Sequence, residues 1–190
     1  LVIADPDTVD VSNLQRQILH GEGDIGRAKV CSARDRLAAL NPATSVITLE
    51  QRLDGVALAE QVAVADLVVD ASDNFTTRYA VNSACVAART PLVSGAAIRL
   101  EGQVAVFRPE LPHSPCYRCL YREGAEAEQT CADNGVLAPV VGVVGSMQAL
   151  EAIKVLTGIG ESLCGRLLIL DAKRMEIRTL TLRRDPECPV

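Results

Sequence analysis

The chain has 190 residues, 48% of them hydrophobic and 23% charged, a composition typical of a soluble globular protein with one domain. Its formal net charge of -5 argues against the broad basic face of a nucleic-acid-binding protein, and its apolar runs read as shorter than the roughly 18 residues of a membrane span. We therefore expect neither a nucleic acid nor a membrane as a partner.

Strands and helices alternate in the first half of the chain. The pattern predicts strands at residues 1–5, 45–49, 66–70 and 91–95, and helices at 27–40, 56–64 and 76–89. Helices of this length between strands imply right-handed crossovers, and therefore a parallel sheet with helices on both faces.

The second half changes character. A strand at 102–107 has no helix behind it, and a long loop runs over 109–138. A loop of this length is functional, disordered or both. The helix at 142–158 is apolar nearly all round, which predicts burial, and strands at 166–172 and 175–183 form an antiparallel pair. We predict one α/β domain over 1–190 with a Rossmann-like sheet, parallel first and antiparallel later.

A glycine-rich stretch, "GEGDIG" at 21–26, spells the G-x-G-x-x-G pattern of dinucleotide-binding turns. It follows a polar segment rather than a buried strand, so we interpret it as a loop. The strand at 1–5 fits better as the second strand of such a unit, because an acid at its end, Asp5, is placed to bind a ribose hydroxyl. Alternatively, Asp5 or Asp7 caps the next turn. The true glycine-rich turn would precede residue 1, so we expect the N-terminal βα unit to be missing from this chain.

Polar and charged residues that suit a triphosphate follow that strand. Arg16 offers a planar fork for phosphate oxygens, and Asn13 and Gln17 are neutral donors. Lys29 stands near the start of a helix, where backbone N–H groups favour an anion. Asp73 follows the strand at 66–70, where a carboxylate can hold Mg²⁺. Taken singly, Lys29 reads as a solvated helix residue and Asp73 as an N-cap.

The seven cysteines are odd in number and irregularly spaced, which indicates a reduced, cytoplasmic protein with one metal site rather than a disulfide scaffold. Cys116 and Cys119 form a C-x-x-C pair, which alone is ambiguous between redox and zinc chemistry. Cys188 starts a second such pair whose other cysteine would lie one position beyond the last residue. We therefore expect the chain to be truncated at this end too.

The chain resembles the ubiquitin-activating-like adenylyltransferases of the MoeB/ThiF/HesA family over essentially all 190 residues. The segments that carry this resemblance are "DPDTVDVSNLQRQ", "GRAK", "DASDNFTTR", "VSGAAIRLEGQ", "CYRC" and "GSMQALEAIK". "VSGAAIRLEGQ" is closer to the MoeB branch, which serves molybdopterin synthase, than to the ThiF branch of thiamine synthesis.

The resemblance implies ATP-dependent adenylation of the C-terminal glycine of a small ubiquitin-like sulfur carrier protein. It implies that ATP and Mg²⁺ are bound by these residues: Asp5 on the ribose; Ser12, Asn13, Arg16 and Lys29 at the phosphates; Asp73 on Mg²⁺; and Asn74 in the same pocket. Gln17, as a neutral donor in the same run, is a further candidate for the nucleotide. Arg16, Lys29 and Asp73 would be the catalytic residues. A homodimer is implied too, in keeping with the apolar helix at 142–158, as is a sulfurtransferase as a further partner.

The resemblance also bears on the cysteines. It implies a structural Zn²⁺ held by four cysteines, of which this chain supplies Cys116, Cys119 and Cys188. Cys131, in the long loop, matches a thiol that forms a sulfur linkage with the carrier in ThiF-type members and is dispensable in MoeB-type members.

Two alternative functions stay open on the sequence. A non-catalytic carrier-binding scaffold would not need Arg16, Lys29 and Asp73 together. A NAD-dependent oxidoreductase on a similar sheet would need a proton donor for hydride transfer, and the sequence offers no convincing one.

Overall fold

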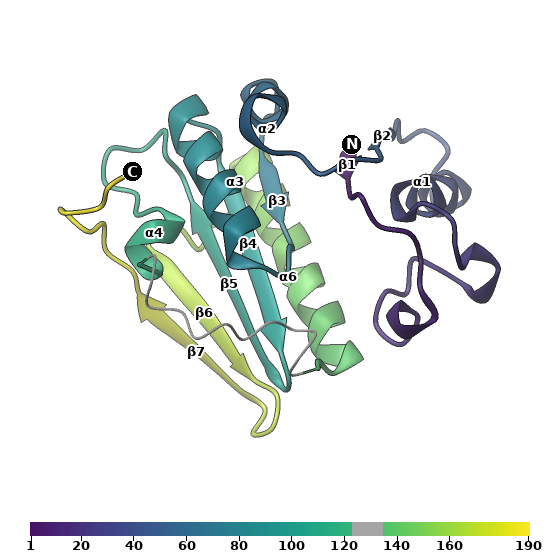
Figure 1. Ribbon diagram of the computed structural model, residues 1–190. Helices are drawn as coiled ribbons and strands as arrows, with labels where there is room; N and C mark the ends of the chain where they lie inside the picture. Colours follow the sequence, from purple (N-terminus) through teal and green to yellow (C-terminus); the bar gives the residue numbers. More distant parts are fainter. Residues whose placement is uncertain (123–134) are drawn as a thin grey trace. The chain divides into compact units, whose positions relative to one another are not determined.

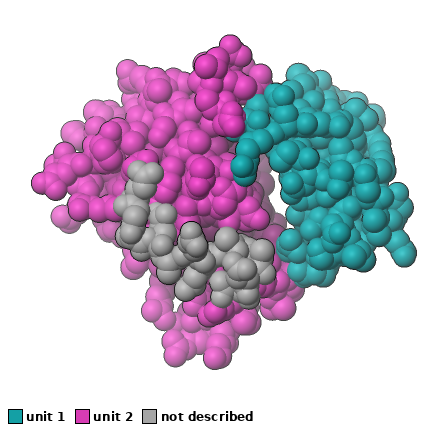
Figure 2. All heavy atoms as spheres, viewed as in Figure 1, with its two compact units in different colours: residues 1–53 teal, residues 54–190 magenta. Residues whose placement is uncertain are grey.

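The structure is a computed structural model that describes residues 1–122 and 135–190 (Figure 1). The chain forms two compact units, residues 1–53 and residues 54–190, which Figure 2 shows in different colours.

The first unit is a small parallel βαβ arrangement. Strand β1 (Val2–Ala4) pairs in parallel with β2 (Ile47–Leu49), and helix α1 (Lys29–Leu40) lies between them in sequence. Two short 3-10 helices, η1 (Val11–Asn13) and η2 (Glu22–Asp24), occupy the connection from β1 to α1. The G-x-G-x-x-G stretch forms η2 and a turn at Gly26, where φ is 84°, so it is part of a loop as predicted.

The second unit is a five-stranded sheet in the order β3-β4-β5-β6-β7. Its strands are β3 (Val68–Asp70), β4 (Leu92–Ile98), β5 (Glu101–Phe107), β6 (Arg166–Asp171) and β7 (Glu176–Thr181). Its helices are α2 (Gly55–Ala63), α3 (Phe75–Ala88), α4 (Tyr117–Leu120) and α6 (Ala138–Thr157). Strands β3 and β4 are parallel, and all later pairs are antiparallel. The predicted change from a parallel to an antiparallel sheet is therefore confirmed.

Helices cover both faces of this sheet, with α3 and α4 on one face and α6 on the other (Figure 1). Successive side chains of each strand point to opposite faces of the sheet, so the two faces have separate cores. Val93, Val104 and Val106 pack with Val140 and Val144 of α6 in one cluster.

Two glycines let α6 approach the sheet closely. A Cβ at Gly95 would lie 2.3 Å from Cδ of Gln148, and one at Gly102 would lie 2.6 Å from Cγ2 of Val144. Gln148 is 4% exposed, and its amide donates to the carbonyls of Asp70 (2.8 Å) and Val93 (3.3 Å). The α6 helix is therefore hydrogen-bonded to the last residue of β3 and to the start of β4, and it packs on β4 and β5.

The outer side of α6 departs from the prediction of a fully buried helix. Leu150, Ile153 and Leu156 are each more than half exposed, because the sheet covers only the side that carries Val140, Val144, Gln148 and Glu151. The sequence-based statement that apolar runs are too short for a membrane span was also wrong for this helix. By length and composition alone, the helix Ala138–Thr157 is long and apolar enough to cross a membrane, with a mean hydropathy of 1.4 over an 18-residue window. Its inner face nevertheless packs on β4 and β5.

Candidate nucleotide and metal sites

The polar run after β1 is ordered by its own hydrogen bonds. Asp10 caps η1 by accepting from the Ser12 N–H (2.8 Å), and the Asn13 side chain returns a bond by accepting from the Asp10 N–H (3.1 Å). Hydrogen bonds from the Ser12 side chain and from its backbone N–H lower the pKa of Asp10. Asn13 is buried, so the sequence-predicted phosphate ligand also has a structural role in holding the turn. Its amide N–H₂ remains the group that can donate to an anion.

Arg16 lies just after this turn. Its Nη1 donates to the Ser12 carbonyl at 3.0 Å, which holds the side chain beside η1 and leaves most of its donors available. Gln17 is half-buried, and its Oε1 has no hydrogen-bond partner among the residues that the structure describes. Ser12, Arg16 and Gln17 thus share one short segment of the first unit.

The carboxyl end of β1 meets the start of α1. Lys29 is the first residue of α1, its Nζ lies 2.8 Å from Oδ2 of Asp7, and its side chain is 12% exposed. Asp5 accepts from the Asp7 N–H at 2.8 Å. The structure therefore brings Lys29 and the acids after β1 together at one edge of the first unit. Asp7 is the anion that Lys29 contacts.

Asp73 belongs to the turn between β3 and α3 in the second unit. This turn begins with an Asx-type bond from the Ser72 N–H to Oδ1 of Asp70 (2.9 Å). Asn74 caps α3 by accepting from the Thr77 N–H (2.8 Å), so the N-cap is Asn74 and not Asp73. Asp73 is exposed and accepts a long bond from the Asn74 amide at 3.3 Å.

These geometries bear on the expected Mg²⁺. An exposed carboxylate in a turn at the carboxyl end of a parallel strand suits a hard cation that prefers oxygen ligands. Asp73 meets that description. Arg16 and Lys29 lie in the first unit, and Asp73 lies in the second. The surroundings given for each residue are therefore those within its own unit.

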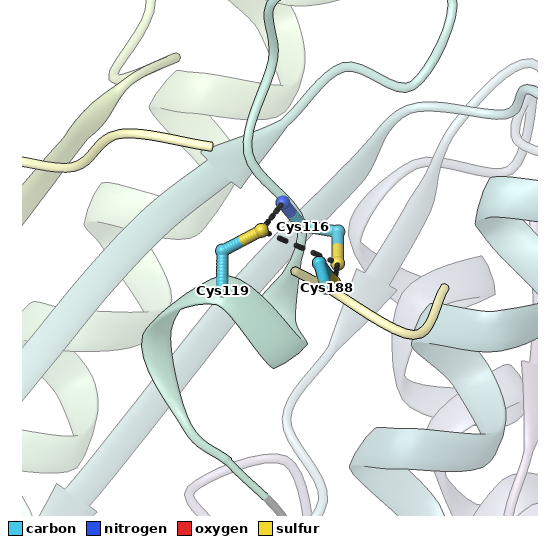
Figure 3. A group of neighbouring side chains, drawn as sticks. All are labelled: Cys116, Cys119 and Cys188. Atoms are coloured by element: carbon cyan, nitrogen blue, oxygen red, sulfur yellow. Dashed lines mark hydrogen bonds between the residues drawn. The ribbon is translucent and has the colours of Figure 1, made fainter. Parts of the chain in front are cut away.

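Three cysteines converge in the second unit, as Figure 3 shows. Cys116 and Cys119 come from the start of α4, and Cys188 comes from the C-terminal segment. The Sγ of Cys116 lies 3.8 Å from that of Cys119 and 3.5 Å from that of Cys188, and all three sulfurs lie within 4.8 Å of one another.

These separations distinguish metal binding from a disulfide. A disulfide needs about 2.0 Å between sulfurs. Four thiolates about 2.3 Å from Zn²⁺ in a tetrahedron would be about 3.8 Å apart, close to the observed values. The three thiols therefore fit three corners of a zinc tetrahedron. Cys131 lies outside the described residues.

Sequence reasoning gave no role to two buried residues near Asp73. Arg78 of α3 is 7% exposed and Tyr117 of α4 is 2% exposed, and Nη1 of Arg78 lies 3.4 Å from Oη of Tyr117. Each stands inside a motif that carries the resemblance, and a charged residue on the buried side of α3 was the available signal.

The chain is similar to known proteins over its whole length. The family model described as "ThiF family" matches residues 1–190. The chain is 47% identical over 190 residues to the molybdopterin-synthase adenylyltransferase of Escherichia coli (strain K12), covering 100% of this chain and 76% of that protein. It is 48% identical over 190 residues to the sulfur carrier protein ThiS adenylyltransferase of the same strain, covering 100% and 75%.

Solved structures share the fold. The crystal structure of E. coli MccB with ATP matches with a TM-score of 0.84 at 24% identity, covering 100% of this chain and 58% of that one. The chain thus spans less than two thirds of the length of that structure.

Proposed function

Because the chain belongs to the ThiF family, we propose that it carries out ATP-dependent adenylation of the C-terminal glycine of a small sulfur carrier protein, with release of pyrophosphate. The observation that carries the proposal is the identity of 47–48% over 190 residues to two adenylyltransferases, one for molybdopterin synthase and one for a sulfur carrier. Two of the acids that suit a nucleotide site, Asp5 and Asp73, follow the carboxyl ends of β1 and β3, where open α/β sheets bind ligands.

The reaction joins two anions, and this decides which residues it needs. The carrier carboxylate attacks the α-phosphorus of ATP, an acyl adenylate forms, and the bond to pyrophosphate breaks. Positive groups must offset the repulsion and the charge that develops on the phosphate oxygens. In the proposal, Arg16 and Lys29 bind phosphate oxygens, and Lys29 exchanges Asp7 for the nucleotide. Asp5 holds the ribose.

Asp73 would hold Mg²⁺, which would supply positive charge to offset that of the phosphates. Asn74 keeps the Asp73 turn in place by capping α3, and its amide orients the Asp73 carboxylate. Ser12, Asn13 and Gln17 contribute neutral donors. No covalent bond to the protein is required, so positioning and electrostatics account for the rate.

The carrier that we favour is the MoaD-like one of molybdopterin synthesis rather than the ThiS-like one of thiamine synthesis. Overall identity does not discriminate, because relatives named for each differ by one percentage point. Residues 93–103, which form the β4–β5 hairpin, read closer to the MoeB branch and support the preference.

Zn²⁺ would be structural in this protein. Cys116, Cys119 and Cys188 fix α4 to the C-terminal segment, and a further ligand would complete the tetrahedron. Cys131 stays a candidate for a sulfur linkage with the carrier.

We also propose that the protein acts as a cytoplasmic homodimer. The support is the exposed apolar side of α6, where Leu150 and Leu156 are 56% and 57% exposed. Contiguous apolar surface of this kind marks an interaction site.

Carrier-dependent exchange of labelled pyrophosphate into ATP tests the function. The intact protein is assayed with MoaD-like and ThiS-like carriers, and the same carriers lacking the final glycine serve as controls. We expect exchange that depends on that glycine and is faster with the MoaD-like carrier. Carrier binding without exchange would favour the scaffold alternative, and NAD reduction without exchange the oxidoreductase.

A further inference from the structure

Arg78 is a buried cation directly behind the Asp73 turn. It is 7% exposed, and two of its nitrogens, Nε at 3.1 Å and Nη2 at 2.5 Å, donate to the carbonyl of Ser72. The guanidinium is therefore hydrogen-bonded to the peptide group that joins Ser72 to Asp73. Both donors converge on the one carbonyl oxygen, so two bonds from the planar guanidinium hold it in place.

The third guanidinium nitrogen of Arg78 has a hydrogen-bond partner on helix α4. Nη1 lies 3.4 Å from the hydroxyl of Tyr117, the first residue of α4. Tyr117 is itself fixed, because its N–H donates to Oδ1 of Asn82 at 2.8 Å and its ring packs edge-on against Tyr79 and Phe107. The hydroxyl that orients Arg78 thus comes from a side chain with little freedom to move.

The charge of Arg78 is not explained by packing. Its hydrogen bonds within the described part of the chain go to neutral oxygens, the Ser72 carbonyl and the Tyr117 hydroxyl. Burying a cation costs free energy because the charge loses its hydration, unless hydrogen bonds offset that cost. An apolar side chain would fill the same volume without the desolvation cost. Burial raises the pKa of the Tyr117 hydroxyl, and the charge of Arg78 and its hydrogen bond oppose that rise.

We propose that Arg78, oriented by Tyr117, is a positioning residue that sets the Asp73 turn for its cation. The inference rests on the proposed function for the role of Asp73, but not for the geometry. Arg78 touches no reacting group. It acts through the backbone of Ser72, and its loss would change where the Asp73 carboxylate points and how often the turn opens.

Tyr117→Phe is the sharpest variant, because it removes the hydroxyl and keeps the ring in its aromatic cluster. Tyr121→Phe is the matched control. Tyr121 packs in the same cluster, 5.2 Å from Tyr117 between ring centroids, and its hydroxyl bonds Gln103 at 2.7 Å. Arg78→Lys, which keeps the charge and loses the fork, is a second variant if Tyr117→Phe has a small effect.

Two readouts are made on the intact protein. Hydrogen exchange of the segment 71–78 is expected to be about three- to tenfold faster in Tyr117→Phe, the scale of one ordinary hydrogen bond, because the lost bond is long at 3.4 Å. The Mg²⁺ concentration that gives half-maximal pyrophosphate exchange is expected to rise by a similar factor, with the rate at saturating Mg²⁺ within about twofold of wild type. Arg78→Lys shifts both further, and Tyr121→Phe shifts neither.

The two proposals fail separately. Absent pyrophosphate exchange in the wild type refutes the adenylation function, and hydrogen exchange still tests the geometry. An active wild type whose Tyr117→Phe and Arg78→Lys variants keep the wild-type protection or the wild-type Mg²⁺ dependence overturns the positioning role. Equal shifts in Tyr121→Phe overturn it too, because they would come from general loosening of the aromatic cluster.

Discussion

Replacing Gly95 by Ala places a methyl group where the Gln148 amide lies. The new Cβ would be 2.3 Å from Cδ and 2.4 Å from Oε1 of Gln148, far inside van der Waals contact. Gln148 can withdraw only by giving up its bonds to the carbonyls of Asp70 and Val93, each worth about 1 kcal/mol. Gly95 does not have a positive φ, so Ala is not strained there and gains up to about 1 kcal/mol from its lower backbone entropy.

Steric overlap outweighs that gain. We expect Gly95→Ala to lower the free energy of unfolding by about 2–3 kcal/mol, within the range for overpacked cores. For a chain of this size that corresponds to a decrease in Tm of about 4–12 °C. The measurement is urea unfolding and differential scanning calorimetry of wild type, Gly95→Ala, Gln148→Ala and the double variant.

The double variant isolates the contact from other effects. Shortening Gln148 removes the atoms that the new methyl group meets, so the double variant should be more stable than the sum of the single losses by at least about 1 kcal/mol. A Gly95→Ala protein as stable as wild type would refute the close approach of α6 to β4. Additive losses would show that Gln148 is not the group in the way.

Three further predictions concern the metal, pH and assembly. Cys119→Ser should abolish stoichiometric zinc in elemental analysis of the purified intact protein; zinc that persists would contradict the three-sulfur site. Burial raises the pKa of Cys85 to about 12 from 9.0, so folding stability falls as pH rises from 9 towards 12, and Cys85→Ala should flatten that decline in chemical unfolding; equal slopes would disprove the linkage. Ile153→Asp on α6 should give monomers in sedimentation velocity, whereas Lys173→Asp should not; a monomeric wild type would refute the dimer.

The order of the elements followed from local patterns. The helices predicted at 56–64 and 76–89 are observed at Gly55–Ala63 and Phe75–Ala88, because apolar periodicity and an N-cap such as Asn74 are local signals. The start of α6 at Ala138 was missed. Pro139 reads as a loop residue in a sequence, although it is favoured in the first turn of a helix.

Features that depend on distant contacts were harder to predict. The burial of α6 was overestimated because periodicity shows that a face is apolar and not that something covers it. The meeting of Cys116 with Cys188, 72 residues away, was implied by resemblance and not by spacing. Arg78 was missed because a charged residue in a helix is usually exposed, and only the tertiary structure shows the Ser72 carbonyl and the Tyr117 hydroxyl around it.

The most direct test of the proposed chemistry is pyrophosphate exchange by Arg16→Ala and Asp73→Ala, one change in each compact unit, with Arg36→Ala as the control on the exposed side of α1. If the cation and the carboxylate act on the same triphosphate, both variants lose at least about 100-fold in carrier-dependent exchange, the scale of one strong transition-state interaction, and the control stays within about twofold. Near-normal exchange in either variant would contradict the roles assigned to these residues.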